Sequence, residues 1–395
     1  MSEANPSSHP LVQWLITEAR RIAEPPAFLA ALAEQLRAHG ADVVRATTGV
    51  PILHPQVHSF SGLWDVGKGA SERVYHLNPA SFAVYENSPT RIVYEGGGPV
   101  RCDPTAPPRE GEFGILADLR SAGMTDYIAL NIPFSDGSSK MMSLATRRPG
   151  GFTDGELALF DLIRPAVAVN LEVQALRRTA RTLLDTYVGR QAGGRVLNGA
   201  IHRGMGETIR AVIWLCDLRG FTVRSEALPR DALIAMLNGY FGAMCDAVDA
   251  HGGEVLKFIG DAMLAIFPIA ADDAGSACRE ALAAAEAAEA AIAAINLQRQ
   301  AGGEAELDYG LALHIGDVLY GNIGGRNRLD FTVIGPAVNL AARIEGLCHE
   351  TGRRPLMSEE FVTASGVPAA ALGDFALKGV AARRSIFAFA APPPP

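Results

Sequence analysis

The pattern of apolar residues in the C-terminal half constrains the fold most. From residue 211 onward, short apolar runs of strand length alternate with longer segments of helical periodicity. The expected order is strand, helix, β-hairpin, helix, strand, strand and helix. These elements cover residues 211–216, 229–251, 254–259 with 263–267, 272–300, 307–314, 331–334 and 338–350. This order predicts a mixed α/β domain in which helices cover a sheet.

Two aspartates lie at strand ends in this half. Asp217 directly follows the apolar run 211–216, and Asp261 follows Gly260 in the tight turn of the hairpin. An acid at the end of a strand projects from the sheet edge, and two such acids on neighbouring strands can hold hard cations such as Mg²⁺. Taken singly, each aspartate is more often a turn residue than a ligand.

Three sequence blocks favour the metal-binding interpretation. They read CDLRGFT at 216–222, LKFIGD at 256–261 and FTVIGPAVNLAAR at 331–343. In content, order and spacing they resemble the signature blocks of class III nucleotide cyclases, and the resemblance extends over roughly residues 207–389. It implies a ferredoxin-like βαββαβ catalytic domain within an α/β (α+β) chain.

The resemblance implies that Asp217 and Asp261 bind two Mg²⁺ or Mn²⁺ ions, with the carbonyl of Leu218 as a further ligand. It also implies that Asn339 orients the ribose and that Arg343 stabilises the transition state. These roles suit the chemistry, because the guanidinium can fork onto phosphoryl oxygens that gain charge. Asn339 and Arg343 are four residues apart and share a helix face. The alternative for Arg343 is a solvated helix charge.

The resemblance assigns the remaining site residues to the substrate. Lys257 would recognise the base with Thr332, Lys378 would bind the terminal phosphates, and Phe221 and Thr222 would complete the contacts. Lys257 can donate to N1 of adenine and Thr332 can accept from N6, whereas guanine reverses both positions. We therefore expect an adenylate cyclase that converts ATP to 3′,5′-cyclic AMP and pyrophosphate. The alternatives are a guanylate cyclase, since a hydroxyl also donates, or a non-catalytic nucleotide-binding dimerisation module.

The resemblance also implies a homodimer. In the family the metal residues and the set from Lys257 to Arg343 lie on opposite faces of the domain, so two chains would build two composite sites. A helix upstream fits this expectation. Thr153 and Glu156 have capping-box spacing. The heptad positions that follow are Leu159, Leu162, Ala166, Val169, Val173, Leu176, Ala180, Leu183 and Tyr187. They predict a parallel two-stranded coil, unless the helix packs on its own domain.

The N-terminal part has a mixed pattern. A helical pattern covers 11–39, and β-like runs follow at 81–85, 91–94, 126–132 and 140–146. The ending GFTDGE at 151–156 and the helix after it resemble a GAF-type domain, which binds small ligands or dimerises. The predicted domains are a GAF-like regulatory domain at 1–155, a signalling coiled coil at 156–190 and the cyclase domain at 191–395.

Composition narrows the partners. The net charge of −8 argues against nucleic acid as the main partner. No segment has the length and apolarity of a membrane span, and the five scattered cysteines favour a reduced, cytoplasmic protein. His314 is the nearest candidate general base, although a core histidine is the more common role. His54 and His58 have helical metal-ligand spacing, but Pro51 and Pro55 disfavour a helix there.

Overall fold

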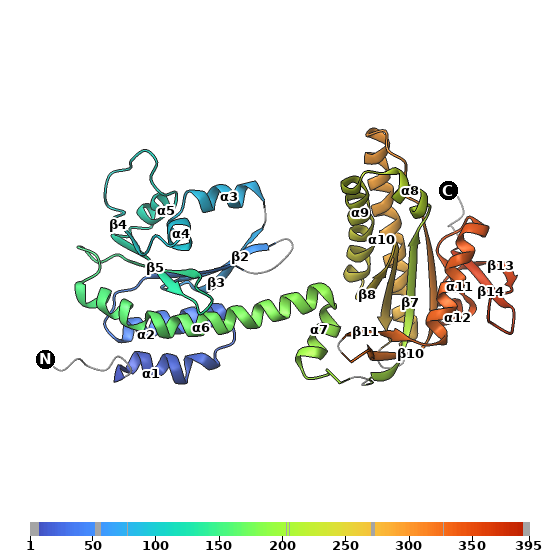
Figure 1. Ribbon diagram of the computed structural model, residues 1–395, viewed down its shortest axis with the longest axis horizontal. Coiled ribbons are helices and arrows are strands. Elements are labelled where there is room, and N and C mark those ends of the chain that lie inside the picture. The colour runs from blue at the N-terminus through green and yellow to red at the C-terminus, as the bar shows by residue number, and fades with distance from the viewer. Residues whose placement is uncertain are drawn as a thin grey trace. The chain divides into compact units, whose positions relative to one another are not determined.

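The computed structural model describes residues 8–51, 57–76, 78–202, 204, 206–269, 273–326 and 328–389. The chain divides into two compact units, Met1–Leu183 and Leu184–Pro395. The division falls inside one long helix, α6 (Asp154–Tyr187), which is labelled in Figure 1. His54 and the Pro-rich tail lie outside the described residues.

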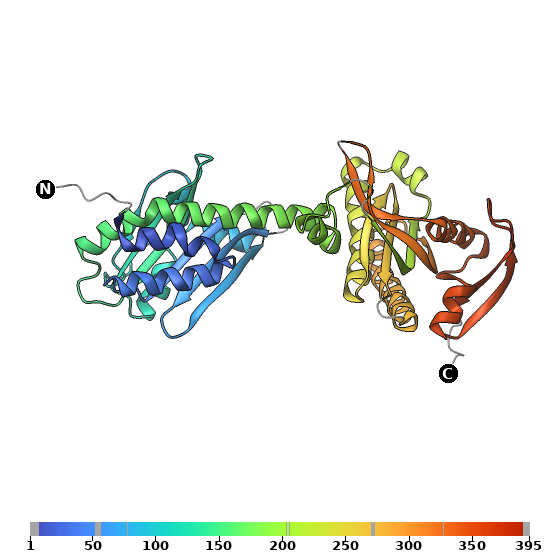
Figure 2. The same cartoon turned by 90° about the horizontal axis from the view of Figure 1, so that it is seen from below.

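The first unit is an antiparallel sheet of six strands with helices on both faces (Figures 1 and 2). The strand order is β3-β2-β1-β6-β5-β4. The strands are β1 (Arg45–Pro51), β2 (Val57–Asp65), β3 (Gly69–His76), β4 (Val100–Cys102), β5 (Asp126–Pro133) and β6 (Ser139–Thr146). One face packs against α1 (Pro10–Thr17), α2 (Pro25–Ala38) and α6. The other face carries α4 (Pro89–Tyr94) and α5 (Ile115–Ser121), and α3 (Pro79–Glu86) lies beside α4.

Two predictions for this unit were wrong. The β-like runs at 81–85 and 91–94 belong to the helices α3 and α4. Each helix has proline in its first turn, where the missing amide hydrogen costs nothing, and Asn78 caps α3 by accepting from the Ser81 amide at 2.9 Å. The predicted long helix at 11–39 is interrupted, because a 3₁₀ turn (Ala19–Arg21) separates α1 from α2.

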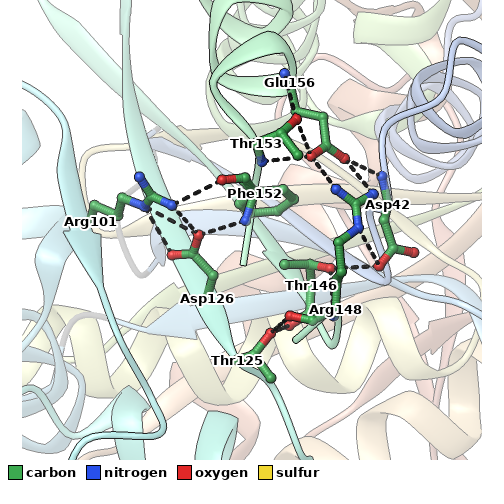
Figure 3. A network of polar contacts seen from close by, with 9 residues as sticks. All are labelled: Asp42, Arg101, Thr125, Asp126, Thr146, Arg148, Phe152, Thr153 and Glu156. Carbon is green, nitrogen blue, oxygen red and sulfur yellow. Dashed lines mark hydrogen bonds and ion pairs between the residues drawn. The ribbon is translucent and has the colours of Figure 1, made fainter. Parts of the chain in front are cut away.

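The start of α6 is held by a network of polar contacts, which Figure 3 shows. The Thr153 amide donates to the Glu156 carboxylate at 2.8 Å, and the Glu156 amide donates to the Thr153 hydroxyl at 3.3 Å. This confirms the predicted capping box. Glu156 also accepts from Arg148 and from the Asp42 amide. Burial opposes ionisation of Glu156, but these donors outweigh it and lower its pKa to about 2.

The heptad positions of α6 fall into two groups. Leu159, Leu162 and Ala166 pack against the core of the first unit, as the alternative for this helix required. From residue 169 onward the positions are exposed. These six residues, which we call the α6 stripe, are Val169, Val173, Leu176, Ala180, Leu183 and Tyr187. The stripe keeps the spacing that a two-stranded coil requires.

The second unit contains an eight-stranded sheet in the order β13-β14-β12-β10-β7-β9-β8, with β11 paired to β10. The strands are β7 (Gly206–Leu218), β8 (Glu254–Ile259), β9 (Ala262–Pro268), β10 (Tyr309–Gly324), β11 (Leu329–Ile334), β12 (Leu356–Ser358), β13 (Ala369–Phe375) and β14 (Arg384–Phe389). The helices are α7 (Arg190–Leu197), α8 (Phe221–Ala227), α9 (Arg230–Ala250), α10 (Ala274–Ala301), α11 (Pro336–Thr351) and α12 (Glu359–Ser365).

The central strands of this sheet follow the predicted topology. Along the chain they run β7, α8 and α9, β8, β9, α10 and β10, and in space they are ordered β10-β7-β9-β8. This is the βαββαβ arrangement of ferredoxin-like folds. Helices α9, α10 and α12 cover one face of the sheet, and α7 and α11 pack on the other, which we call the α11 face. Ile213, Leu215 and Leu264 project from the α11 face and pack with Ala337 and Ala341 of α11.

Three further expectations can be compared with the fold. His314 is 5% exposed, its Nδ1 lies 2.8 Å from the Ser358 hydroxyl, and burial lowers its pKa to about 4, which makes it a core histidine. All five cysteines are free. Among the residues that the structure describes, no helix is both long enough and apolar enough to cross a membrane.

Candidate functional site

The two predicted metal ligands lie next to each other. Asp217 is the penultimate residue of β7 and pairs with Ala262, the first residue of β9. Asp261 immediately precedes Ala262 in the β8–β9 turn, where Gly260 adopts a φ of +67°. The Leu218 amide donates to the Asp261 carbonyl at 3.4 Å. Neighbouring strands thus bring the two carboxylates to one edge of the sheet.

The electrostatics of this edge favour a cation. Burial raises the pKa of Asp217, and the neighbouring charge of Asp261 raises it further, while Arg219 opposes both effects. Carboxylate and carbonyl oxygens are the ligands that Mg²⁺ prefers. No cluster of three or more metal-ligating acids, histidines or cysteines occurs among the described residues. Two carboxylates therefore fit a metal that takes its other ligands from water or substrate phosphates.

Asn339 and Arg343 lie one turn apart on the solvent side of α11, and both are exposed. The opposite side of this helix is buried against the sheet and includes Ile344 and Glu345. Positions two residues apart on a helix differ by about 200°. Arg343 therefore points away from Glu345, which lies close enough to Asp217 and Asp261 to feel their charges. Arg343 is exposed, and it is turned away from the side of α11 on which Glu345 feels these charges.

Glu345 ties α11 to the strand that carries Asp217. The Arg219 guanidinium donates to the Glu345 carboxylate and, at 3.1 Å, to the Glu345 carbonyl. Burial raises the pKa of Glu345 to about 7, Arg219 opposes this, and the charges of Asp217 and Asp261 add to it. Gly310 pairs with Asp217 across β10 and β7, and a Cβ there would overlap both charged groups of the pair.

Lys257 lies on β8, next to the hairpin turn that contains Asp261. It pairs with Leu264 of β9, which projects from the α11 face. Asp217 is two residues beyond Leu215, which projects from the same face. Cross-strand partners and alternate residues of a strand share a face. Lys257 and Asp217 therefore lie on the same face of the sheet, and the expectation that they lie on opposite faces of the whole domain stays a prediction.

Thr332 is at the centre of β11 and is only 3% exposed. Its hydroxyl has no hydrogen-bond partner among the described residues. A buried hydroxyl without a partner is costly in a folded protein, so it marks a place where a partner is missing. Any contact of this hydroxyl with a base therefore requires local opening around β11.

The other predicted substrate residues are dispersed around the sheet edge. Phe221 and Thr222 begin α8, which follows the strand β7 that carries Asp217, and Thr222 is exposed. Leu218 is buried at the end of β7, and its backbone amide donates to the carbonyl of Asp261 in the β8–β9 turn. Lys378 is exposed in the turn between β13 and β14. The structure shows no contact between Lys378 and the aspartate pair.

Comparison with known proteins finds a similarity for most of the second unit. Residues 207–365 match the family model described as the adenylate and guanylate cyclase catalytic domain. This segment is thus similar to nucleotide cyclase catalytic domains. The match contains both aspartates, Lys257, Thr332, Asn339 and Arg343. Cyclases of this class are generally metal-dependent, which agrees with the ligand chemistry of the aspartate edge.

Similar proteins share the cyclase domain. The adenylate cyclase of Anabaena cylindrica is 40% identical over 166 residues, which is 41% of this chain and 32% of that protein. Adenylate cyclase 1 of Rhizobium meliloti is 34% identical over 145 residues, 36% of this chain and 21% of that protein. The chain thus matches about a third or less of either relative. The adenylyl cyclase CyaB from P. aeruginosa is a similar solved structure, with 26% sequence identity and a TM-score of 0.44. The match covers 48% of this chain and 97% of that one.

The first unit has a candidate site of its own. A cavity of about 1000 Å³ lies between strands β1 to β3 and helices α3 to α5. Hydroxyl side chains of the sheet line it, among them Thr47, Ser59, Ser61 and Ser71, and so do several tyrosines. At one end Arg45 pairs with Asp65 at 2.6 Å. A sheet face that is covered by helices yet lined with hydroxyls is unusual for a structural core.

Two features of the site were not predicted. Arg219 lies inside a signature block and Glu345 is two residues beyond another, but neither received a role. The two residues are 126 positions apart, so the sequence does not reveal that they form an ion pair. The strand register then shows that a side chain at Gly310 would occupy the space of this pair. A glycine in the middle of an apolar strand was the one available signal.

Proposed function

We propose that the protein is a homodimeric adenylate cyclase that converts ATP to 3′,5′-cyclic AMP and pyrophosphate. The adjacent carboxylates of Asp217 and Asp261, inside a segment that matches cyclase domains, are the observation that supports this most. When bound, divalent cations supply positive charge that lowers the pKa of the 3′-hydroxyl and neutralises phosphate charge. Asp217, Asp261 and the Leu218 carbonyl would hold two Mg²⁺ or Mn²⁺ ions.

The choice of ATP rests on Lys257. A lysine can only donate hydrogen bonds, so it suits the N1 acceptor of adenine and not the N1–H of guanine. The Anabaena cylindrica and Rhizobium meliloti relatives are named adenylate cyclases, which agrees with this assignment. Thr332 would accept from the exocyclic amine of adenine once its buried hydroxyl becomes accessible.

Assembly of the site from two chains is supported by the orientation of α11. Because Arg343 points away from the Asp217 of its own chain, it can reach a nucleotide on the Asp217 of a second chain. Phe258, Ile259 and Ile334 are exposed around the site and are 45–52% accessible. Apolar side chains exposed in this way fit a surface that a second copy covers. The α6 stripe would pair in the same dimer.

Product assays test this proposal. The purified protein should convert ATP to cyclic AMP with Mg²⁺ or Mn²⁺, and a chelator should abolish the reaction. Cyclic GMP from GTP at a higher kcat/KM would instead identify a guanylate cyclase. If a protein shown to be dimeric forms neither cyclic nucleotide with either metal, the proposal is contradicted and the chain is a non-catalytic dimerisation module.

We further propose that the first unit regulates the cyclase by binding a small polar molecule in the cavity. The hydroxyl lining and the size of the cavity support this, because ligand pockets have volumes of roughly 300–1,000 Å³. Mass spectrometry of small molecules released from the purified full-length protein would identify the ligand. Filling the cavity with Ser61→Trp should change cyclase activity, and unchanged activity would contradict regulation through this cavity.

A further inference from the structure

We propose that Arg219, Glu345 and Gly310 couple the two active sites of the dimer to each other. Arg219 and Glu345 would act as positioning residues, not as catalytic residues. This inference rests on the proposed function, because it requires that each site takes its metals from one chain and its arginine from the other. It adds a mechanical link inside each chain between the two half-sites that the chain supplies.

The first step is the location of the pair. Arg219 lies two residues after Asp217. We call residues 217–220, which run from the end of β7 to the start of α8, the metal segment. Its backbone amide donates to the Asp308 carbonyl at 2.8 Å, which fixes the main chain of this segment. The guanidinium makes two contacts with Glu345, one to the carboxylate and one to the carbonyl. The metal segment is therefore attached to both the side chain and the backbone of α11.

The second step is the position of Glu345 on α11. Glu345 is 7% exposed and lies on the buried side of the helix, while Asn339 and Arg343 lie on the exposed side. A shift or rotation of the helix would move both sides together, because an α-helix moves as a rigid element. A movement of Glu345, which Arg219 contacts, therefore also moves Arg343. In the same way, a movement of Arg343 is passed through Glu345 and Arg219 to the metal segment.

The third step is the space around the pair. Gly310 lies directly across from Asp217 in the β7–β10 pairing. A Cβ on Gly310 would overlap the Glu345 carboxylate and the Arg219 guanidinium. The two charged groups thus lie directly on the strand, with no side chain between them. Such close packing transmits displacement, whereas an exposed ion pair would absorb it.

The functional consequence follows from the composite sites. In a dimer, the metal segment of one chain would serve the first site, and α11 of the same chain would serve the second. The Arg219–Glu345 pair joins these two parts. Nucleotide and metal at one site would then adjust the arginine of the other, which predicts cooperative dependence of the rate on ATP.

Hybrid dimers with a single intact site test the link. One chain carries Asp217→Asn and the other carries Arg343→Ala, and differently tagged chains are purified as the heterodimer. The intact site combines Asp217 of the Arg343→Ala chain with Arg343 of the Asp217→Asn chain. Glu345→Gln is then introduced into either chain alone. In the Asp217→Asn chain it can affect the intact site only through α11, because the metal segment of that chain is already inactive.

Coupling predicts that each placement lowers activity in its own way. Glu345→Gln in the Asp217→Asn chain should lower kcat on the order of ten-fold with little change in KM, because Arg343 is misplaced. In the Arg343→Ala chain it should raise the Mg²⁺ concentration needed for half-maximal activity. Gly310→Ala, which displaces the pair without removing a charge, should reproduce both effects. Glu304→Gln, which removes an exposed carboxylate that pairs with the largely buried Arg299, is the matched control and should change neither.

The outcomes separate the two proposals. An inactive hybrid without Glu345→Gln, in a verified heterodimer, contradicts the composite site itself. An active hybrid that is insensitive to Glu345→Gln in the Asp217→Asn chain contradicts coupling, and the pair then serves only its own metal segment. Thermal melting of each dimer controls for misfolding, since a purely structural effect would lower the melting temperature without the split between kcat and Mg²⁺ dependence.

Discussion

At the scale of single residues, chemistry depends on which way each side chain points. Arg343 and Glu345 are two positions apart, yet one is exposed to solvent and the other is buried beside the metal edge. Lys257 lies on the same sheet face as Asp217, and its side chain can only donate hydrogen bonds. These orientations are the reason for the proposal that each chain supplies two separate half-sites.

The proposed role of Lys257 in base selection can be tested directly. Lys257→Glu replaces a donor by an acceptor and should invert the preference for the purine ring. We expect the ratio of kcat/KM for ATP over GTP to fall by roughly 100-fold or more, as for sites built to hydrogen-bond one partner. Cyclic AMP and cyclic GMP would be quantified by chromatography. Lys140→Glu in the first unit is the matched charge control, and an unchanged ratio in Lys257→Glu would contradict base recognition by this residue.

At the scale of elements, α6 changes its environment along its length. Its first turns are held by Glu156, Arg148 and Asp42 and by core contacts of the first unit (Figure 3). Arg101 and Asp126 extend the network, and the Phe152 amide donates to Asp126 at 2.9 Å. Beyond residue 169 the apolar stripe is exposed. A helix that is fixed at one end and exposed along the rest is suited to pass a movement of its base to a partner helix.

The anchor at Glu156 predicts a pH dependence of stability. Its pKa is about 4.5 in the unfolded chain and about 2 in the fold, so the unfolded state binds more protons as the pH falls. Its stabilisation is complete above pH 4.5 and is lost between pH 4.5 and pH 2. Near neutral pH, Glu156→Gln should lower the free energy of unfolding of the first unit by about 3 kcal/mol, because it leaves Arg148 without its charged partner.

Urea unfolding measures this effect in the first unit when it is followed through Trp14 and Trp64 fluorescence in a Trp214→Phe background, since Trp214 belongs to the second unit. The difference between wild type and Glu156→Gln should shrink as the pH is lowered through this window. Glu86→Gln, in an exposed pair with Arg91, should differ from wild type by about 0.5 kcal/mol or less. A difference for Glu156→Gln that stays constant with pH would show that the carboxylate charge is not the source of the stability.

At the scale of the whole molecule, the proposed dimer has two interfaces. The cyclase domain offers exposed apolar residues around the site, and the α6 stripe offers heptad positions upstream of it. Each interface alone could hold two chains together. Acting in one dimer, they would connect the cavity of the first unit, for which we propose a regulatory role, with the proposed composite sites.

The α6 stripe can be removed without touching the site. The double variant Leu176→Ser and Leu183→Ser should weaken the dimer at least ten-fold, since two chains each lose buried apolar surface. Sedimentation velocity over a dilution series measures the dissociation constant, and specific activity should fall with it at low protein concentration. Arg177→Ser, one position from the stripe, is the control. Unchanged dimerisation in the double variant would mean that the catalytic domains alone hold the chains together.

Much of the site could be predicted from the sequence because its signals are local. The aspartates follow apolar runs of strand length, the hairpin turn contains glycine, and the capping box needs only four residues. Each depends on neighbours a few positions away, which the periodicity of the chain reveals. The central βαββαβ order followed from the same patterns and from the resemblance.

The failures share a different cause. The runs at 81–85 and 91–94 are apolar enough for strands, but proline at the start of each helix and packing against the sheet decided otherwise. The heptad positions of α6 look alike in sequence, yet the first three are covered by their own core. Burial depends on segments far away in the chain, so spacing alone could not divide them.

The sequence by itself determined the chemistry that is available: two acids at strand ends, a lysine that can only donate, and an arginine on a helix. Only the tertiary structure decided how these groups can meet. It joined Arg219 to Glu345 across 126 residues and turned Arg343 away from its own metal edge. The physical reason is that side-chain identity is fixed residue by residue, whereas direction and contact arise from strand register and helix packing.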